Sequence, residues 1–337
     1  MLRHYNIPIF VPEEACPNRC VFCNQYKISG SYKMPSIAEV EDKILTYLKT
    51  FKPESRIEIA FFGGNFTGID ISLQKQFLDV AQRFIEIGSV HGIRLSTRPD
   101  YIDKSRMDFL SQYKISCIEL GAQSMDDEVL TLAGRGHSAD DIAKASDLIN
   151  SYRIEFGLQM MIGLPGDNAQ KSLKTAEEIV RLGAKSTRIY PALVIENTKL
   201  AEMFRNGEYK PLSLEEAINN AKQLVLVFEN ANVKILRMGL HPSEELNNEK
   251  SLLAGPFHPA FGQLVYSDIW KDIFEKKLAG LNFSEKDEII IETAPSQINA
   301  AVGNQGSNKK YFSRKFASVR FKTNTSLKNR ECNILVK

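Results

Sequence analysis

Three cysteines near the amino terminus have a spacing that could support chemistry. Cys16, Cys20 and Cys23 form a C-x3-C-x2-C pattern, and only Cys117 and Cys332 add to them in a chain of 337 residues. A clustered and odd set of cysteines is typical of a metal site rather than of a disulfide framework. Three thiolates can hold three irons of a cubane [4Fe–4S] cluster, which leaves the fourth iron open to a small molecule.

A zinc site is the alternative interpretation of the same triplet. A structural zinc ion needs a fourth protein ligand to close its tetrahedron, and His4 is the only histidine nearby in the sequence. A non-enzymatic zinc or iron–sulfur binding module is therefore kept as one of the functional hypotheses.

Short apolar runs alternate with segments of helical periodicity over the first 238 residues. Strands are expected at 7–11, 57–62, 93–97, 116–121, 156–162, 187–191 and 233–237. Helices are expected at 37–49, 72–87, 105–113, 139–152, 170–182 and 214–230. This alternation predicts a parallel sheet with right-handed crossovers. The expected fold class is α/β, a partial (β/α)6 TIM-like barrel with a small C-terminal extension.

The domain organisation expected from these patterns has three parts. Residues 1–238 would form the partial barrel, 239–282 an extension of that domain, and 283–337 a small basic, β-rich region that covers or extends the mouth of the barrel. One helix is expected at 264–278, followed by strands at 288–292, 317–322 and 332–336.

Positive charge is concentrated at the C-terminal end. The whole chain carries a net charge of +2, but residues 303–337 hold nine Lys or Arg against the single acid Glu331. The aromatic residues that interleave with this basic run are Tyr311, Phe312, Phe316 and Phe321. Such a surface suits phosphate backbones and unstacked bases, so RNA is a predicted partner. A solvated C-terminal hairpin without a partner is the alternative.

The overall composition excludes several classes of protein. With 43% hydrophobic and 25% charged residues the chain is typical of a globular protein rather than of a disordered or fibrous one. No apolar run approaches the roughly 18 residues of a membrane helix, and the N-terminal apolar run is too short for a signal peptide. We therefore expect a cytoplasmic protein that does not bind membranes.

Polar motifs recur where the expected strands end. They are Phe-Phe-Gly-Gly-Asn-Phe-Thr (61–67), Ser-Thr-Arg-Pro-Asp (96–100), Glu-Leu-Gly-Ala-Gln-Ser (119–124), Arg-Gly-His (135–137) and Gln-Met-Met-Ile-Gly-Leu-Pro-Gly (159–166). The carboxyl ends of barrel strands are where β/α barrels place their chemistry.

The ordered set of these motifs resembles the radical S-adenosylmethionine (SAM) superfamily. It is most similar to the domain shared by the Elongator catalytic subunit and oxygen-independent coproporphyrinogen oxidases, over roughly residues 5–280. The resemblance implies that SAM chelates the open iron through its amino and carboxylate groups. An electron from the cluster would then cleave the C5′–S bond to give methionine and a 5′-deoxyadenosyl radical.

The resemblance also implies which residues bind the two cofactors. The metal ligands would be Cys16, Cys20 and Cys23. The residues that contact SAM would be Phe22, Gly63, Gly64, Asn65, Ser96, Arg98, Gln123, Arg135 and Gln159. Phe22 would lie against the adenine, Gln123 would hydrogen-bond the ribose, and Arg135 would bind the methionine carboxylate, which a planar guanidinium grips with two hydrogen bonds.

The chain also departs from the family pattern. Gln159 is neutral where coproporphyrinogen oxidases have an acid, and Ser96 replaces a glutamate found in relatives. No region after residue 280 is long enough for the acetyltransferase domain of Elongator catalytic subunits, so the Elongator reaction is not expected.

The sequence leaves the catalytic residues and the substrate open. Candidates for contacting substrate are Glu119, Tyr190 and His258, although Glu119 and Arg98 could instead form buried ion pairs at the strand ends. A tRNA nucleotide is the first substrate hypothesis, and a small metabolite or porphyrin-type compound is the second. An external electron donor of the flavodoxin or ferredoxin type would be needed.

Overall fold

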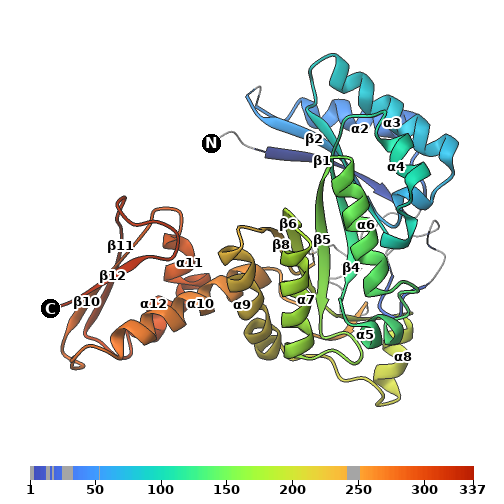
Figure 1. The fold of residues 1–337 in the computed structure, drawn as a ribbon. Helices are drawn as coiled ribbons and strands as arrows, with labels where there is room; N and C mark the ends of the chain where they lie inside the picture. The colour runs from blue at the N-terminus through green and yellow to red at the C-terminus, as the bar shows by residue number, and fades with distance from the viewer. Residues whose placement is uncertain (1–3, 13–15, 17–18, 25–32, 53, 241–250) are drawn as a thin grey trace.

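A seven-stranded parallel sheet forms the centre of the molecule (Figure 1). The computed structural model describes all residues except 1–3, 13–15, 17–18, 25–32, 53 and 241–250. The strands, in their order across the sheet, are β1 (His4–Val11), β2 (Arg56–Gly63), β3 (Gly92–Thr97), β4 (Ile115–Gln123), β5 (Glu155–Ile162), β6 (Ser186–Pro191) and β8 (Lys234–Met238). The predicted partial barrel is confirmed, and β8 adds a seventh strand to its six β/α units.

Within the described residues, the longest helix after each barrel strand leads the chain to the next strand. These helices are α2 (Ile37–Leu48), α3 (Ile71–Glu86), α4 (Lys104–Leu110), α6 (Ala139–Ser151), α7 (Ala169–Arg181) and α9 (Leu214–Asn230). The N-caps Ser36, Ser138 and Ser213 each accept a hydrogen bond from the backbone three residues on, and an acidic side chain there bonds back to complete a capping box. These caps explain why the helix starts could be predicted closely.

The two faces of the sheet differ in polarity. Residues such as Ile59, Leu95 and Ile118 are fully buried and contribute to the main apolar core. Their neighbours along the strands point to the opposite face because side chains alternate. That inner face carries charged groups, including Glu58 and Arg94.

Several short elements after the strand ends were not predicted. They are α5 (Asp127–Leu132), α8 (Lys199–Arg205), and the paired strands β7 (Val194–Ile195) and β9 (Leu252–Ala254). Elements of two to seven residues are too short to show a helical or strand period. None of the helices in the described ranges is both long and apolar enough to cross a membrane.

A second, smaller core lies at the C-terminal end. Its elements are α10 (Phe261–Leu278), β10 (Glu288–Thr293), α11 (Ile298–Val302), α12 (Ser307–Phe312), β11 (Ser318–Thr323) and β12 (Cys332–Val336). β10 is the central strand, parallel to β11 and antiparallel to β12. The strands at the C-terminal end and helix α10 agree with the expectation, whereas α11 and α12 were missed because they are short. We call residues 284–337 the C-terminal unit.

The aromatic residues of the basic run do not form the expected stacking surface. Phe312 is fully buried and Phe316 is 4% exposed, and both pack in the core of the C-terminal unit with Trp270 and Phe274. The prediction that these two rings stack on unpaired bases is wrong, because they supply the apolar surface that a small domain needs.

The C-terminal unit lies beside α9 and α10 rather than over the carboxyl ends of the barrel strands (Figure 1). Arg330 pairs with Glu229 near the end of α9 at 2.6 Å and lies over the ring of Tyr266 on α10. These contacts hold the unit at the side of the barrel, so of the two expected arrangements, covering or extending the mouth, the first is not observed.

Candidate active site

The cysteine segment follows β1 and is held by backbone hydrogen bonds to short elements near it. The Val21 N–H donates to the carbonyl of Ala133 at 3.0 Å, and the Val21 carbonyl accepts from Leu200 N–H at 2.8 Å. A turn brings the Cys23 N–H to 3.0 Å from the Cys20 carbonyl. Thus α5 and α8, which were not predicted, position the segment that carries the triplet.

Arg135 contacts this segment directly. Its Nη1 lies 3.1 Å from the sulfur of Cys20, its Nη2 donates to the Gly121 carbonyl at 2.5 Å, and its Nε donates to His137 Nε2 at 3.2 Å. Burial, followed by the positive charge of Arg135, lowers the pKa of His137 to about 4. A neutral imidazole is what the Arg135 Nε–H needs as an acceptor, so His137 fixes the arginine beside the thiol.

The glycine motif brings the end of β2 against the end of β1. The Gly64 N–H donates to the Val11 carbonyl at 2.7 Å. Gly63 has φ +114°, and a Cβ there would lie 2.3 Å from the same oxygen. Only glycine fits this close approach of two backbones.

Asn65 links the end of β2 to the end of β3 through hydrogen bonds. Its side-chain oxygen accepts hydrogen bonds from the Thr97 hydroxyl at 2.6 Å and from the Arg98 N–H at 3.3 Å, and the residue is fully buried. The position where relatives are expected to bind SAM therefore also has a structural role in this chain.

Three buried polar atoms at the ends of β3 and β4 lack a hydrogen-bond partner among the described residues. They are Ser96 Oγ, Arg98 Nη1 and Gln123 Oε1. Buried polar groups are nearly always satisfied in native proteins, and of the eight such atoms among the described residues these three lie at the ends of two adjacent strands. A polar molecule such as SAM, with hydroxyl, amino and carboxylate groups, could supply the missing partners.

The other nitrogens of Arg98 are already engaged. Arg98 Nε and Nη2 each donate to the carboxylate of Asp100 at 2.9 Å, and Nη2 also donates to the Arg135 carbonyl at 2.6 Å. Burial by itself would lower the pKa of Arg98, but Asp100 raises it, with smaller contributions from Cys20 and Cys16. Arg98 therefore forms a buried ion pair with Asp100, which is one of the two roles that the sequence allowed for it. Its Nη1 remains available to a ligand.

Phe22 lies between two small apolar clusters. It packs with Val21 and Leu200 on one side and with Val129 and Ala133 on the other. The half-buried ring is thus fixed within the cysteine segment.

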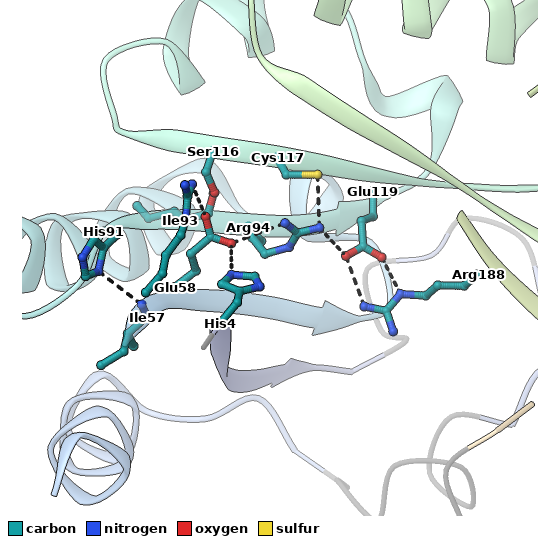
Figure 2. A network of polar contacts seen from close by, with 11 residues as sticks. His4, Ile57, Glu58, His91, Ile93, Arg94, Ser116, Cys117, Glu119 and Arg188 are labelled. Atoms are coloured by element: carbon teal, nitrogen blue, oxygen red, sulfur yellow. Dashed lines mark hydrogen bonds and ion pairs between the residues drawn. The ribbon is translucent and has the colours of Figure 1, made fainter. Parts of the chain in front are cut away.

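A network of charged side chains crosses the inner face of the sheet (Figure 2). Glu58 on β2 contacts Arg94 on β3 at 3.3 Å, and Arg94 contacts Glu119 on β4 at 3.2 Å. Glu119 in turn pairs with Arg188 on β6 at 2.6 Å, and the Arg188 guanidinium lies 5.1 Å from the centre of the Phe62 ring. Four strands are therefore linked by alternating acidic and basic groups.

Glu119 is the centre of this network, with 1% of its surface exposed. Burial alone would raise the pKa of its carboxyl, but the hydrogen bonds and charge of Arg188, together with Arg94, lower that pKa below its usual value. Gln159 donates to the same carboxylate at 3.3 Å. The structure thus shows the buried ion pair that the sequence offered as the alternative to a catalytic role for Glu119.

The other two candidates for substrate contact lie on separate elements. Tyr190 is on β6, two residues after Arg188 on the same face of the strand. His258 lies in the loop before α10, where its Nδ1 accepts a hydrogen bond from the Ala260 N–H at 3.0 Å. That bond gives His258 a local structural role.

His4 is engaged far from the triplet. Its Nε2 lies 2.8 Å from the Glu58 carboxylate at the start of β1, whereas the cysteines follow the end of that strand. His4 therefore lies at the opposite end of the eight-residue strand β1 from the cysteines that a zinc site would use. Within the described residues, no group of three His, Cys, Asp or Glu side chains is arranged to hold a single metal ion.

Glu58, Arg94 and the pairing role of Arg188 were missed from the sequence. Glu58 interrupts the apolar run Ile57–Phe62, and Arg94 interrupts the buried strand 92–97. A charge inside such a run must find a partner when it is buried, so this interruption was a usable signal.

Family models match nearly the whole barrel and the first part of α10. The radical SAM superfamily model matches residues 11–179, and the Radical_SAM C-terminal domain model matches residues 184–271. Among curated proteins, a tRNA uridine(34) acetyltransferase of Methanocaldococcus jannaschii is 32% identical over 252 residues, which cover 63% of this chain and 47% of that protein. The same enzyme of Methanocaldococcus infernus is 33% identical over 190 residues, covering 50% and 36%. The chain thus spans about half or less of the length of these relatives.

Solved structures show the same fold. Elp3 of Methanocaldococcus infernus with residues 1–46 deleted has a TM-score of 0.62 and 24% identity, covering 84% of this chain and 65% of that one. Streptococcus suis SuiB bound to S-adenosylmethionine has a TM-score of 0.51 and 12% identity, covering 71% and 50%. With half of the chain matched by the superfamily model, the protein belongs to the radical SAM superfamily, whose enzymes use a [4Fe–4S] cluster and SAM.

Proposed function

We propose that this radical SAM enzyme holds its cluster through Cys16, Cys20 and Cys23 and modifies a nucleotide of tRNA. The observation that carries the proposed cofactor site is the set of unpartnered atoms on Ser96, Arg98 and Gln123. They lie at strand ends on the side of the barrel where Arg135 touches Cys20.

The chain's own residues have separate tasks in this site. The cluster, when bound, supplies the electron that cleaves SAM to the 5′-deoxyadenosyl radical. Arg135, which already lies at the Cys20 sulfur and is held by His137, would grip the methionine carboxylate. Gly63 and Gly64 would admit the methionine amino group, and Gln123 would donate to or accept from the ribose.

The substrate proposal draws on the relatives and on charge. The curated relatives named above act on uridine 34 of tRNA, as their names state. Residues 303–337 add a net charge of +8, which favours contact with phosphates. We extend the proposal to an external reductant of the flavodoxin or ferredoxin type and to a location in the cytoplasm, with the chemical group that is added left open.

The first experiment tests the reaction class. The protein is purified and reconstituted without oxygen and incubated with dithionite and SAM, and 5′-deoxyadenosine is quantified by chromatography. Cys20→Ala should abolish its release. Cys332→Ala is the matched control, because Cys332 is also buried but lies on β12 in the C-terminal unit, and it should release 5′-deoxyadenosine at the rate of the unmodified chain.

Three outcomes would contradict parts of the proposal. Release that persists in Cys20→Ala rejects the assigned ligands. A colourless protein that contains zinc and no iron supports the binding-module hypothesis instead. Mass spectrometry of tRNA nucleosides from cells with and without the gene tests the substrate, and identical nucleoside profiles would reject tRNA.

A further inference from the structure

The two short helices of the C-terminal unit are joined by the turn Gly303-Asn304-Gln305-Gly306. Both glycines have positive φ values, 89° and 74°. A Cβ on Gly303 would lie 2.3 Å from Ser307 Oγ, whereas a Cβ on Gly306 would meet nothing within 4 Å. Gly303 is therefore required by the tight turn, and Gly306 leaves an open backbone surface that another chain can approach closely.

Hydrogen bonds to α10 hold the turn in place. The Asn304 N–H donates to the hydroxyl of Ser267 at 2.9 Å. The buried side chain of Asn308 donates to the carbonyls of Ser267 at 2.8 Å and of Ala301 at 3.1 Å. Because the backbone is already held in place, a ligand bound there would not have to order it.

Basic side chains follow the turn on α12 and just after it. Lys309 and Lys310 on α12 and Arg314 just after it are exposed, and none of the three forms an ion pair with any described residue. By contrast, Lys315 is close to Glu275, and Arg320 pairs with Glu288 at 3.4 Å. Three cations that follow the turn in the sequence thus remain available for anions.

Two acids in the groove beside the turn share one lysine. A groove lined by Ser307 and Asn308 also contains Asp268 and Asp272. Both carboxylates lie 2.6 Å from Lys222 Nζ. Lys222 therefore offsets one of these two charges, and the three cations Lys309, Lys310 and Arg314 outnumber the one that remains.

We propose that this Gly-X-X-Gly turn binds the sugar–phosphate backbone of single-stranded RNA. A Gly-X-X-Gly loop is the element with which KH modules clamp the backbone of about four nucleotides, and here it likewise joins two helices packed on a small sheet. The phosphates contact the open backbone at Gly306 and the side chains of Lys309, Lys310 and Arg314. This inference rests on the proposed function and adds to it the surface that holds the RNA outside the barrel.

The test replaces the two central residues of the turn with acids in the full-length protein. Asn304→Asp together with Gln305→Asp adds two negative charges where the phosphates would lie, with little change of shape. Fluorescence anisotropy with a labelled single-stranded RNA dodecamer should show an affinity loss of about tenfold or more. The matched control is Gln76→Glu with Gln112→Glu, which adds the same charge at exposed positions of α3 and of the turn after α4, and it should bind as tightly as the unmodified chain.

A second variant guards against a folding defect. Lys309→Ala, Lys310→Ala and Arg314→Ala together remove exposed side chains only, so the melting curve should stay unchanged while RNA affinity falls and depends less on salt. Unchanged binding by both variants overturns the proposal. So does an equal loss in the Gln76/Gln112 control, which would indicate net charge alone. Equal affinity for a DNA dodecamer of the same sequence would overturn the choice of RNA.

The result can be separated from the outcome for the active site. Both variants should release 5′-deoxyadenosine from SAM at the normal rate, because the turn belongs to a different core from the cysteine segment. Failure of the Cys20→Ala experiment would reject the cluster ligands and leave the RNA-binding result valid. Normal cluster chemistry with no RNA binding would reject the turn alone.

Discussion

The charge network inside the barrel yields the sharpest stability prediction. Glu119→Gln removes the charge that pairs with Arg188 at 2.6 Å and with Arg94 at 3.2 Å. Arg94 keeps Glu58 as a partner, but Arg188 keeps only a hydrogen bond with the Tyr190 side chain and the ring of Phe62, and neither of these carries a compensating charge. Removing one member of a buried ion pair in this way costs about 3–5 kcal/mol.

The magnitude can be measured by thermal and denaturant unfolding. A chain of this size loses about 2 °C of melting temperature per kcal/mol, so Glu119→Gln should melt about 8 °C lower. Glu128→Gln is the matched control, since Glu128 is 69% exposed and pairs with Lys171 on the surface, and exposed pairs contribute at most about 1 kcal/mol. Its melting temperature should change by no more than about 2 °C.

A double mutant tests the cause. Glu119→Gln combined with Arg188→Gln removes the stranded cation, so it should be more stable than the sum of the two single changes predicts, with a coupling energy of about 2 kcal/mol. Additive effects would refute the reasoning. A variant that keeps its stability but no longer cleaves SAM would show instead that the carboxylate contacts a cofactor or substrate.

Three further predictions concern separate parts of the chain. Gly63→Ala should destabilise the protein by more than about 2 kcal/mol and weaken SAM binding in calorimetry, because its Cβ would clash with the Val11 carbonyl. The control is Gly183→Ala, at a residue with φ +85° and open space around it, which should destabilise the protein less. Equal effects of the two changes would reject the clash. His4 and Arg94 lower the pKa of Glu58 to about 2, against the effect of burial. Ionised Glu58 should therefore contribute about 3 kcal/mol to the free energy of unfolding above pH 4.5, and this contribution is lost as the pH falls through 2. Unfolding measured over this pH range should show the loss in the unmodified chain and not in Glu58→Gln. Phe316→Ala should cost about 3 kcal/mol and lower the RNA affinity in anisotropy, and a normal melting curve would contradict its place in the C-terminal core.

Features that depend on neighbouring residues can be predicted from the sequence, and those that depend on distant residues cannot. The triplet, the glycine motif and the helix caps are local patterns, so residues such as Ser36 and Gly63 could be interpreted without knowing the fold. The inner network could not be predicted in the same way. Arg188 meets Glu119 across 69 positions of sequence, and that meeting depends on the register of β4, β5 and β6.

In the C-terminal unit, by contrast, one local sequence pattern is compatible with two different structures. Phe312 and Phe316 lie four residues apart among lysines, and this spacing suits both an exposed stacking surface and one face turned to a core. Composition could not decide between them. The three-stranded sheet decides it, since β10 and its neighbours need an apolar cover that these rings supply.

The position of the C-terminal unit also bears on the size of the substrate. Phe261, at the start of α10, packs against Gly239 just beyond the carboxyl end of β8, and Ser267, which anchors the Gly-X-X-Gly turn, lies six residues further along the same helix. At 1.5 Å per residue this is about 9 Å of helix. A small metabolite held in the barrel would not contact a basic surface at the side of the molecule. If the turn binds RNA as proposed, one part of the strand can lie on the turn while another nucleotide enters the barrel, an arrangement that a free metabolite does not offer.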